Sequence, residues 1–388
     1  MYKIEQKMIN TAIQYRHVLF FAAVTFLSVW LRMSGRGFVS DDMIDFLLPW
    51  YDSFQSKGWR ALSEQIGDYN LAYQTFMAAV SQIPWNPIYM IKGLSLIFDY
   101  ALAMLLAVQI CKIKQEKIFS VTGNLLYAAV LFLPTVVFNS AFWGQCDSIY
   151  TFFLFASWFA FYHEKYRRAF ILFGLAAAFK LQALFFLPLI FMLYFYKKNF
   201  SLLNLGWSLL TFWGSGIIAY INGRDLLAPF TIYMNQADTY HAMQLNMPSF
   251  WLVVSNAYET LHQFGILLAL ILLGTAFYLV LCGRVSLKGF EFSSLMFCWV
   301  FWTLLLFLPA MHERYSYPLD LMLVVLLFFT KRYWFHAASC LLISVMTYSM
   351  YLFNDGVIEP WYGIAWFLLW AYFTVLFFKQ VSVRGREI

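Results

Sequence analysis

Two neighbouring carboxylates are the first side chains in the sequence that could do chemistry. Asp41 and Asp42 begin a long polar segment that follows the first apolar run. A carboxylate held in a fixed position can act as a general base, taking a proton from a reacting hydroxyl. Aspartate is also common at helix N-termini, where it accepts hydrogen bonds from free backbone amides, so a capping role is the structural alternative.

Two short connectors between apolar runs are unusually polar. Residues 143–147 read Trp-Gly-Gln-Cys-Asp, and residues 312–315 read His-Glu-Arg-Tyr. A tight connector between apolar helices needs only Gly, Pro or Ser, so bulky polar groups in both places indicate a site. The structural alternative is a salt bridge within the second connector, or from it to Asp320.

Three ionisable residues lie inside apolar stretches, where such residues are functional candidates by default. Lys92 and Asp99 are seven residues apart and share one face of a helix, and a structural pairing with another helix is the alternative. Lys180 interrupts a second apolar stretch. An unpaired ammonium at membrane depth costs several kcal/mol, so a phosphate-bearing ligand would be a natural partner for it.

Composition places these residues in a membrane protein. The 388-residue chain is 62% hydrophobic and 12% charged, against roughly 25% charged residues in ordinary soluble domains. Apolar runs of the length that crosses a bilayer recur along the chain, and they are continuous rather than alternating, which favours helices over a β-barrel. We therefore expect an all-α polytopic membrane protein. Charged residues are absent from four of the longest runs: 118–146, 199–223, 292–312 and 361–378.

The distribution of Lys and Arg predicts the topology. Most of them fall in alternate loops, and basic loops remain cytoplasmic. The net charge of +6 reflects these loops and does not indicate a nucleic-acid partner. With about twelve transmembrane helices, we expect both termini on the cytoplasmic side of the cell membrane and the polar connectors on its outer side. The first apolar run lacks a small-residue cleavage site, so we interpret it as a retained helix.

The expected elements form one transmembrane domain, residues 1–388, without a separate soluble domain. A long first outer loop spans 33–85, and residues 165–198 form two short helices in a hairpin with Lys180 at its tip. The remaining spans are expected near 14–32, 87–110, 119–138, 147–163, 200–221, 262–282, 290–309, 317–330, 335–352 and 361–378.

The first outer loop carries a helical stripe that begins after Asp42. An amphipathic helix in the membrane interface fits this pattern, with a kink at Pro49, and a second such helix is expected over 59–66. The stripe recurs with helical spacing at Met43, Phe46, Leu47, Trp50, Tyr51 and Phe54.

An outward-facing pocket with one carboxylate and several cations suits sugar transfer from a lipid-phosphate donor. The leaving phosphate is an anion that Lys, Arg and His can bind. Nearby carboxylates tolerate the positive charge that develops on the sugar, as in glycoside hydrolysis. Asp42 could supply the base for the acceptor hydroxyl, and positioned cations would make a metal or other cofactor unnecessary.

In the order and placement of these polar patches, the sequence resembles the GT-C fold polyprenyl-phosphate-sugar glycosyltransferases. The likeness is to bacterial members in particular, and to the glucosyl- and mannosyltransferases of the dolichol pathway. The likeness extends from the first to the tenth predicted helix and depends on the order and placement of short patches. These patches are 40–42 through 49–50, 67–70 with Tyr73, 91–92 with 98–99, Asn139 with 143–145 and Asp147, 179–180 with Gln182, 246–251, and 311–315.

The resemblance implies inverting transfer of a hexose from an isoprenoid-phosphate donor, with an essential acid in the first outer loop. That acid is Asp42 here, or Asp41 as the second choice. Since no soluble outer domain is expected, a glycan or a lipid-linked acceptor is implied. The expected donor-phosphate residues are Lys180, Gln182, Arg224, His312 and Arg314. The expected acceptor and pocket residues are Tyr69, Trp143, Gln145, Asp147, Asn246, Glu313 and Tyr315.

Two other functions remain open at this point. A transporter or flippase for lipid-linked sugars would explain the ionisable residues in the apolar stretches, but not the long amphipathic loop, and no paired repeat is visible. A glycan polymerase or ligase would share the pocket and use a lipid-pyrophosphate donor. The expected partners are the lipid donor, the acceptor and membrane lipid, with a monomer or weak dimer as the assembly.

Overall fold

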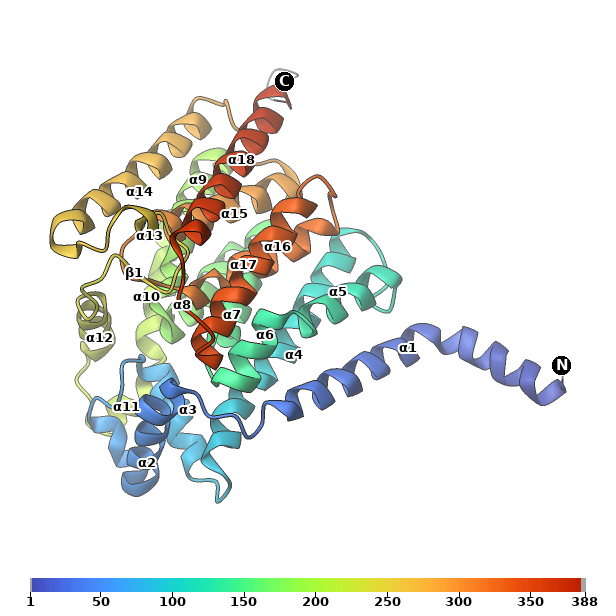
Figure 1. Cartoon of the computed structure of the whole chain (residues 1–388), viewed down its shortest axis with the longest axis horizontal. Helices are drawn as coiled ribbons and strands as arrows, with labels where there is room; N and C mark the ends of the chain where they lie inside the picture. The colour runs from blue at the N-terminus through green and yellow to red at the C-terminus, as the bar shows by residue number, and fades with distance from the viewer. Residues whose placement is uncertain (1, 385–388) are drawn as a thin grey trace.

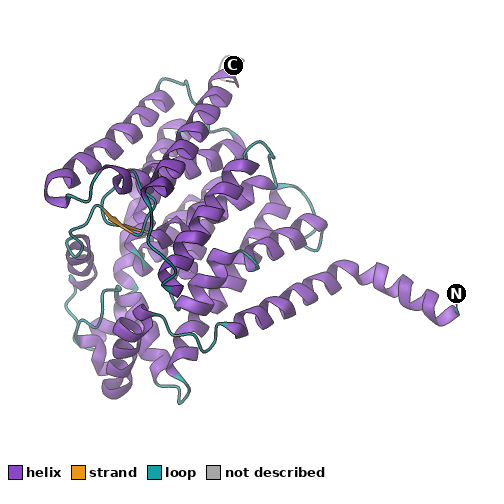
Figure 2. Cartoon of the chain, in the orientation of Figure 1, coloured by secondary structure: helices purple, strands orange, loops and turns teal. Residues whose placement is uncertain are grey.

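The computed structural model describes residues 2–384, and most of them are helical (Figure 2). This confirms the all-α class. Within this described range, six helices are long and apolar enough to cross a membrane, whereas the total of about twelve crossings and the orientation of the termini remain predictions. The six are α1 (Lys3–Ser34), α4 (Pro87–Ile113), α14 (Tyr258–Leu281), α15 (Gly289–Phe307), α17 (Trp334–Phe353) and α18 (Pro360–Arg384).

Several of the other expected crossings are shorter or broken. A bend of 51° separates α5 (Val121–Leu131) from the next apolar helix, which begins at Pro134, because proline cannot continue the hydrogen-bond ladder. That helix passes from α6 (Pro134–Val137) into a π-helical turn, η3 (Phe138–Trp143). The shorter helices are α7 (Asp147–Tyr162), α10 (Leu205–Gly214), α11 (Ile217–Ile221) and α16 (Tyr317–Leu327).

The segment 165–198 breaks at Lys180, as expected, but it is not a packed hairpin. Its halves are α8 (Tyr166–Phe179) and α9 (Leu187–Lys197), joined by a 3₁₀ turn, η4 (Leu181–Phe186). α8 packs mainly on α7 and α10, whereas α9 packs on α14 and α15. The two halves therefore diverge, and the break at Lys180 lies inside the protein.

The first loop folds into a compact helical layer at the end of the molecule opposite the C-terminus (Figure 1). The predicted stripe forms η1 (Met43–Leu47), a π-helical turn, and α2 (Leu48–Lys57). Pro49 lies in the first turn of α2, where proline is tolerated, so it does not kink a continuous helix. The second predicted stretch forms a 3₁₀ turn, η2 (Gly58–Ser63), and α3 (Leu71–Ser81) is a helix that we did not predict.

The centre of the fold is α15, almost all of whose residues are buried. It packs on α14, α16 and α18. By contrast, α1 packs mainly on α5 and extends away from the body toward the N-terminus (Figure 1). The remaining elements are η5 (Leu202–Asn204), α12 (Ala228–Ala237), β1 (Gln244–Leu245), α13 (Trp251–Val254), β2 (Met311–His312) and η6 (Glu313–Ser316).

Two of the buried ionisable residues, Asp99 and Lys92, have partners within the protein, which favours a structural role for both. Asp99 of α4 forms a buried salt bridge with Arg32 of α1 at 3.0 Å. The Lys92 ammonium donates to the carbonyl oxygens of Gly35 and Phe38 at 2.8 and 2.6 Å. These contacts fix the start of the first loop against α4.

Candidate active site

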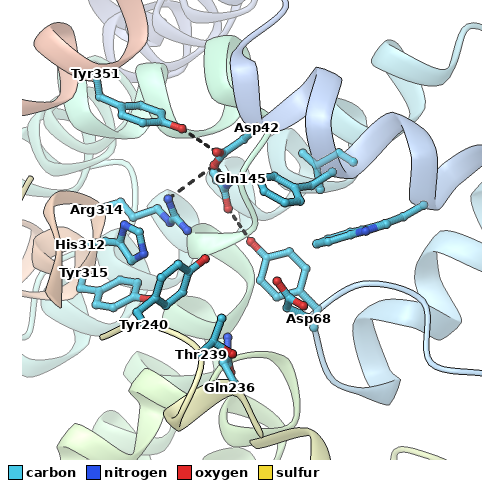
Figure 3. Close-up of a pocket in the computed structure, with 14 residues that line it drawn as sticks. Asp42, Asp68, Gln145, Gln236, Thr239, Tyr240, His312, Arg314, Tyr315 and Tyr351 are labelled. Atoms are coloured by element: carbon cyan, nitrogen blue, oxygen red, sulfur yellow. Dashed lines mark hydrogen bonds and ion pairs between the residues drawn. The ribbon is translucent and has the colours of Figure 1, made fainter. Parts of the chain in front are cut away.

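The carboxylate of Asp42 lies where three distant segments of the chain meet (Figure 3). Its Oδ2 accepts hydrogen bonds from the Trp143 indole N–H at 2.8 Å and from the Gln145 side-chain amide at 2.7 Å. Its Oδ1 accepts from the Tyr351 hydroxyl at 2.6 Å. The Arg314 guanidinium lies 3.5 Å from Oδ2. The carboxylate is therefore held in one orientation by side chains from η3, the turn after it, α17 and η6.

The backbone before Asp42 explains why its carboxylate is free to face these groups. The hydroxyl of Ser40 accepts a hydrogen bond from the Met43 amide at 3.2 Å and donates to the Trp143 carbonyl oxygen at 3.2 Å. Ser40 thus takes the capping role that was the alternative for an aspartate. Asp41 is exposed and is not among the residues that line the cavity, so the structure places Asp42 and not Asp41 at the site.

Two glycines shape the turns that bring the other segments in. Gly144 adopts a left-handed backbone with φ of +80°, and a Cβ there would lie 2.5 Å from the Met43 methyl group. At Gly67, with φ of +72°, a Cβ would overlap the Trp50 indole. Any other residue at either position would be strained and would push the first loop outward. The π-helical turns η1 and η3 lie on either side of the contact between Met43 and Gly144. Such turns are frequent at functional sites.

A second set of buried side chains lies behind the residues that hold the Asp42 carboxylate. The Tyr69 hydroxyl donates to the Gln145 side-chain oxygen at 2.5 Å, which orients the amide that holds Asp42. Beneath it, the Lys180 ammonium donates to Asp147 at 2.6 Å and lies 5.5 Å from the Tyr69 ring centroid. Asn139 donates to the other oxygen of Asp147 at 2.7 Å. Lys180 therefore has a buried carboxylate partner and does not line the cavity, in contrast to the predicted contact with the donor phosphate.

A small polar cavity of about 80 Å³ opens beside Asp42. Arg314 and His312 lie on one side of it with Tyr240, Asp68 lies on the other, and Thr239 lies between them (Figure 3). The pairing of β1 with β2 holds the chain around residue 244 against His312, and the Tyr240 ring packs edge-on against the imidazole.

The cavity has one permanent cation among the described residues that line it. Burial lowers the pKa of His312 well below its usual range, and the charges of Arg314 and Lys180 act in the same direction. The imidazole is therefore neutral and can donate one hydrogen bond. The charge that an anionic group would meet here comes from Arg314, whose guanidinium also packs 5.0 Å from the Trp143 ring centroid.

Glu313 is buried in the turn before α16, and we expect it to make stability depend on pH. Neither of its carboxylate oxygens has a hydrogen-bond partner in the described chain, so the predicted salt bridge within the connector is not formed. Burial raises the pKa of Glu313 to about 7, with Arg314 opposing the shift and Asp42 and Asp147 adding to it. The folded protein thus holds the proton more tightly than the unfolded chain, whose carboxyl titrates near ~4.3.

The stabilisation from neutral Glu313 is fully present below the unfolded pKa and is lost as the pH rises toward about 7. The thermal unfolding midpoint of the wild-type protein should fall between about pH 5 and about pH 8. In Glu313→Gln the fall should be smaller, because glutamine does not ionise. Identical pH profiles of the two proteins would contradict the burial of an ionisable carboxyl at this position.

The buried pair of Lys180 and Asp147 should contribute to stability as a unit. Lys180→Met leaves the Asp147 carboxylate buried without its cation, and we expect a loss of about 3–5 kcal/mol in the free energy of unfolding. The double variant Lys180→Met with Asp147→Asn removes both charges and should recover most of that loss. Denaturant unfolding in detergent micelles measures both, and equal destabilisation of the single and double variants would show that the pair is not coupled.

The structure brings six of the predicted site residues to the cavity. They are Asp42, Tyr69, Gln145, His312, Arg314 and Tyr315. Trp143, Asp147, Lys180 and Glu313 lie directly behind it. Gln182 is buried elsewhere, Asn246 adopts a left-handed turn beside His312, and Arg224 lines a neighbouring cavity.

Sequence reasoning missed several residues of the cavity wall. Asp68 adjoins the predicted Tyr69 and could have been included on that ground. Tyr351 carries no sequence signal, because it is one aromatic residue among many in an apolar run. The other missed residues are Phe46, Leu47, Trp50, Gln236, Thr239 and Tyr240.

Comparison with known proteins adds no identification. No protein-family model matches the chain, and no curated protein is significantly similar to it in sequence. The function must therefore be inferred from the residues and their geometry.

Proposed function

We propose that the protein transfers a hexose from a polyprenyl-phosphate-linked donor to a hydroxyl of a glycan or lipid-linked acceptor. The transfer inverts the anomeric centre, and Asp42 is the general base. The observation that carries this proposal is a carboxylate fixed by several donors, facing a polar cavity that is also lined by Arg314, 3.5 Å from that carboxylate, and by His312. The predicted topology places this reaction on the outer face of the cytoplasmic membrane.

The proposed chemistry follows from the hydrogen-bonding capacity that these side chains have left. The Asp42 Oδ1 accepts from Tyr351 alone, so a lone pair remains for the proton of the acceptor hydroxyl. The acceptor oxygen forms a bond to the anomeric carbon while the bond from that carbon to the phosphate oxygen breaks. The proton passes to Asp42, and the electron pair leaves with the phosphate. Arg314 and the neutral His312 stabilise that leaving group by charge and by hydrogen bonding.

An apolar groove next to the cavity supports a lipid-bearing donor. The groove has a volume of about 520 Å³ and is lined by side chains of α8, η4, α9, α10 and α12. From α12 it receives Phe230, Tyr233, Met234 and Ala237, which share one helical face. Ala237 is the last residue of α12, and the chain continues directly to Thr239 and Tyr240 in the cavity wall. A lipid chain bound in this groove would lie along α12, whose C-terminal end leads into the cavity wall.

A transfer assay tests the proposal. Purified protein in nanodiscs is incubated with short-chain polyprenyl-phosphate glucose or mannose and a panel of oligosaccharides, with and without EDTA. We expect glycan extension that EDTA does not inhibit. Strict metal dependence would contradict the metal-free mechanism. Lipid scrambling without transfer would identify a flippase instead, and transfer only from a pyrophosphate donor would identify a polymerase or ligase.

A further inference from the structure

A second polar cavity adjoins the first and is not used by the mechanism above. Its volume is about 210 Å³. Asp68, Gln236 and Thr239 line both cavities, so the two meet at this shared wall. The second cavity continues away from Asp42 toward Gln65 of the first loop and Arg224.

The helix α12 separates this cavity from the apolar groove. Thr231, Asn235 and Gln236 of α12 line the polar cavity, whereas Phe230 and Met234 line the groove. Helical spacing places these two sets on opposite faces of α12. The polar cavity therefore lies along one face of α12 and the apolar groove along the other, and the polar cavity meets the first cavity at Gln236 and Thr239.

The chemistry of the second cavity favours a neutral polyhydroxyl ligand. Five of its nine lining residues carry a side-chain amide or hydroxyl, groups that can both donate to and accept from sugar hydroxyls. Asp68 and Arg224 are the charged residues that line it, and their formal charges cancel, so a phosphate gains little here. The side-chain oxygen of Gln236 is buried without a hydrogen-bond partner in the described chain, which leaves an acceptor available to a ligand.

We infer that this cavity is the acceptor subsite and that it holds the neutral sugar units of a glycan chain behind the reacting hydroxyl. The inference rests on the proposed function, since it assigns the second substrate of that reaction. Asp68 lies across the cavity from Arg314 and His312 (Figure 3). An acceptor held in the second cavity would therefore enter past Asp68, on the side of the cavity away from Arg314 and His312.

Two substitutions test the subsite. Asn235→Trp fills the cavity, and Gln236→Ala removes the unpartnered oxygen without adding bulk. Each should raise the KM for the acceptor glycan by about tenfold or more, the loss of one or two hydrogen bonds, with little change in the KM for the donor. Asp238→Trp is the matched control, because Asp238 follows α12 but its side chain is 88% exposed.

A binding measurement separates this inference from the proposed function. Saturation-transfer NMR is recorded with the full chain in nanodiscs, using maltotetraose, cellotetraose, mannotetraose and chitotetraose as probes. At least one should bind to the wild-type protein and to Asp238→Trp, and bind weakly to Asn235→Trp. Binding without any transfer would overturn the proposed function but retain the glycan site. Transfer with unchanged acceptor KM in both variants, or no binding by any probe, would overturn the subsite.

Discussion

Replacing Asp42 with Asn should lower kcat for sugar transfer by roughly 10²–10⁴-fold, the usual contribution of a general base. Asparagine has nearly the same shape, and its side-chain oxygen can still accept from Trp143 and Gln145. It cannot take the proton of the acceptor hydroxyl. The loss should therefore appear in kcat, measured with saturating short-chain donor, and donor binding should change much less.

Asp41 supplies the matched control for this result. Its carboxylate is one residue away, exposed and outside the cavity. Asp41→Asn should transfer sugar at the wild-type rate, and both variants should remain monodisperse with similar unfolding midpoints. Full activity of Asp42→Asn, or equal losses in the two variants, would remove Asp42 from the reaction.

Replacing Arg314 with Gln should lower kcat/KM for the lipid donor by about 10²–10³-fold, the scale expected when one stabilising donor to a developing anion is lost. The reason is that Arg314 is the one permanent cation lining the cavity within the described chain, because His312 is buried and neutral. Steady-state kinetics with varied donor concentration measure the effect.

The conservative variant Arg314→Lys separates charge from geometry. It should recover part of the lost kcat/KM, since lysine keeps the charge but not the planar fork that faces Asp42. Arg60→Gln, in the exposed η2 turn of the first loop, is the control for removing a positive charge at the same end of the molecule. If Arg314→Gln and Arg60→Gln behaved alike, the donor phosphate would bind elsewhere.

The all-helical class, the break at Lys180 and the helical stripe of the first loop could be predicted from apolar runs and polar interruptions. The stripe after Asp42 forms η1 and α2, and its members Met43, Leu47, Tyr51 and Phe54 are buried. The burial of this stripe could be predicted because helical periodicity is a local property of the sequence.

The contacts that define the site could not be predicted in this way. The sequence predicts a phosphate partner for Lys180, whereas the structure gives it Asp147. That carboxylate lies 33 residues away in another helix, so no local pattern connects the two residues. Tyr351 reaches Asp42 across 309 residues. Such pairings depend on how helices pack, and one sequence contains no periodic signal for them. The helix α3 was not predicted for a different reason. It lies within the long first loop, and its sequence has no charged residues to mark a polar face.

The stereochemistry of the product tests the central claim most directly. The purified protein is given a β-linked short-chain polyprenyl-phosphate glucose and an oligosaccharide acceptor in the presence of EDTA, and the new glycosidic linkage is assigned by NMR. Direct displacement at the anomeric carbon with Asp42 as base predicts a single α-linked product. A β-linked product, or no glycan product with any polyprenyl-phosphate hexose, would contradict the account.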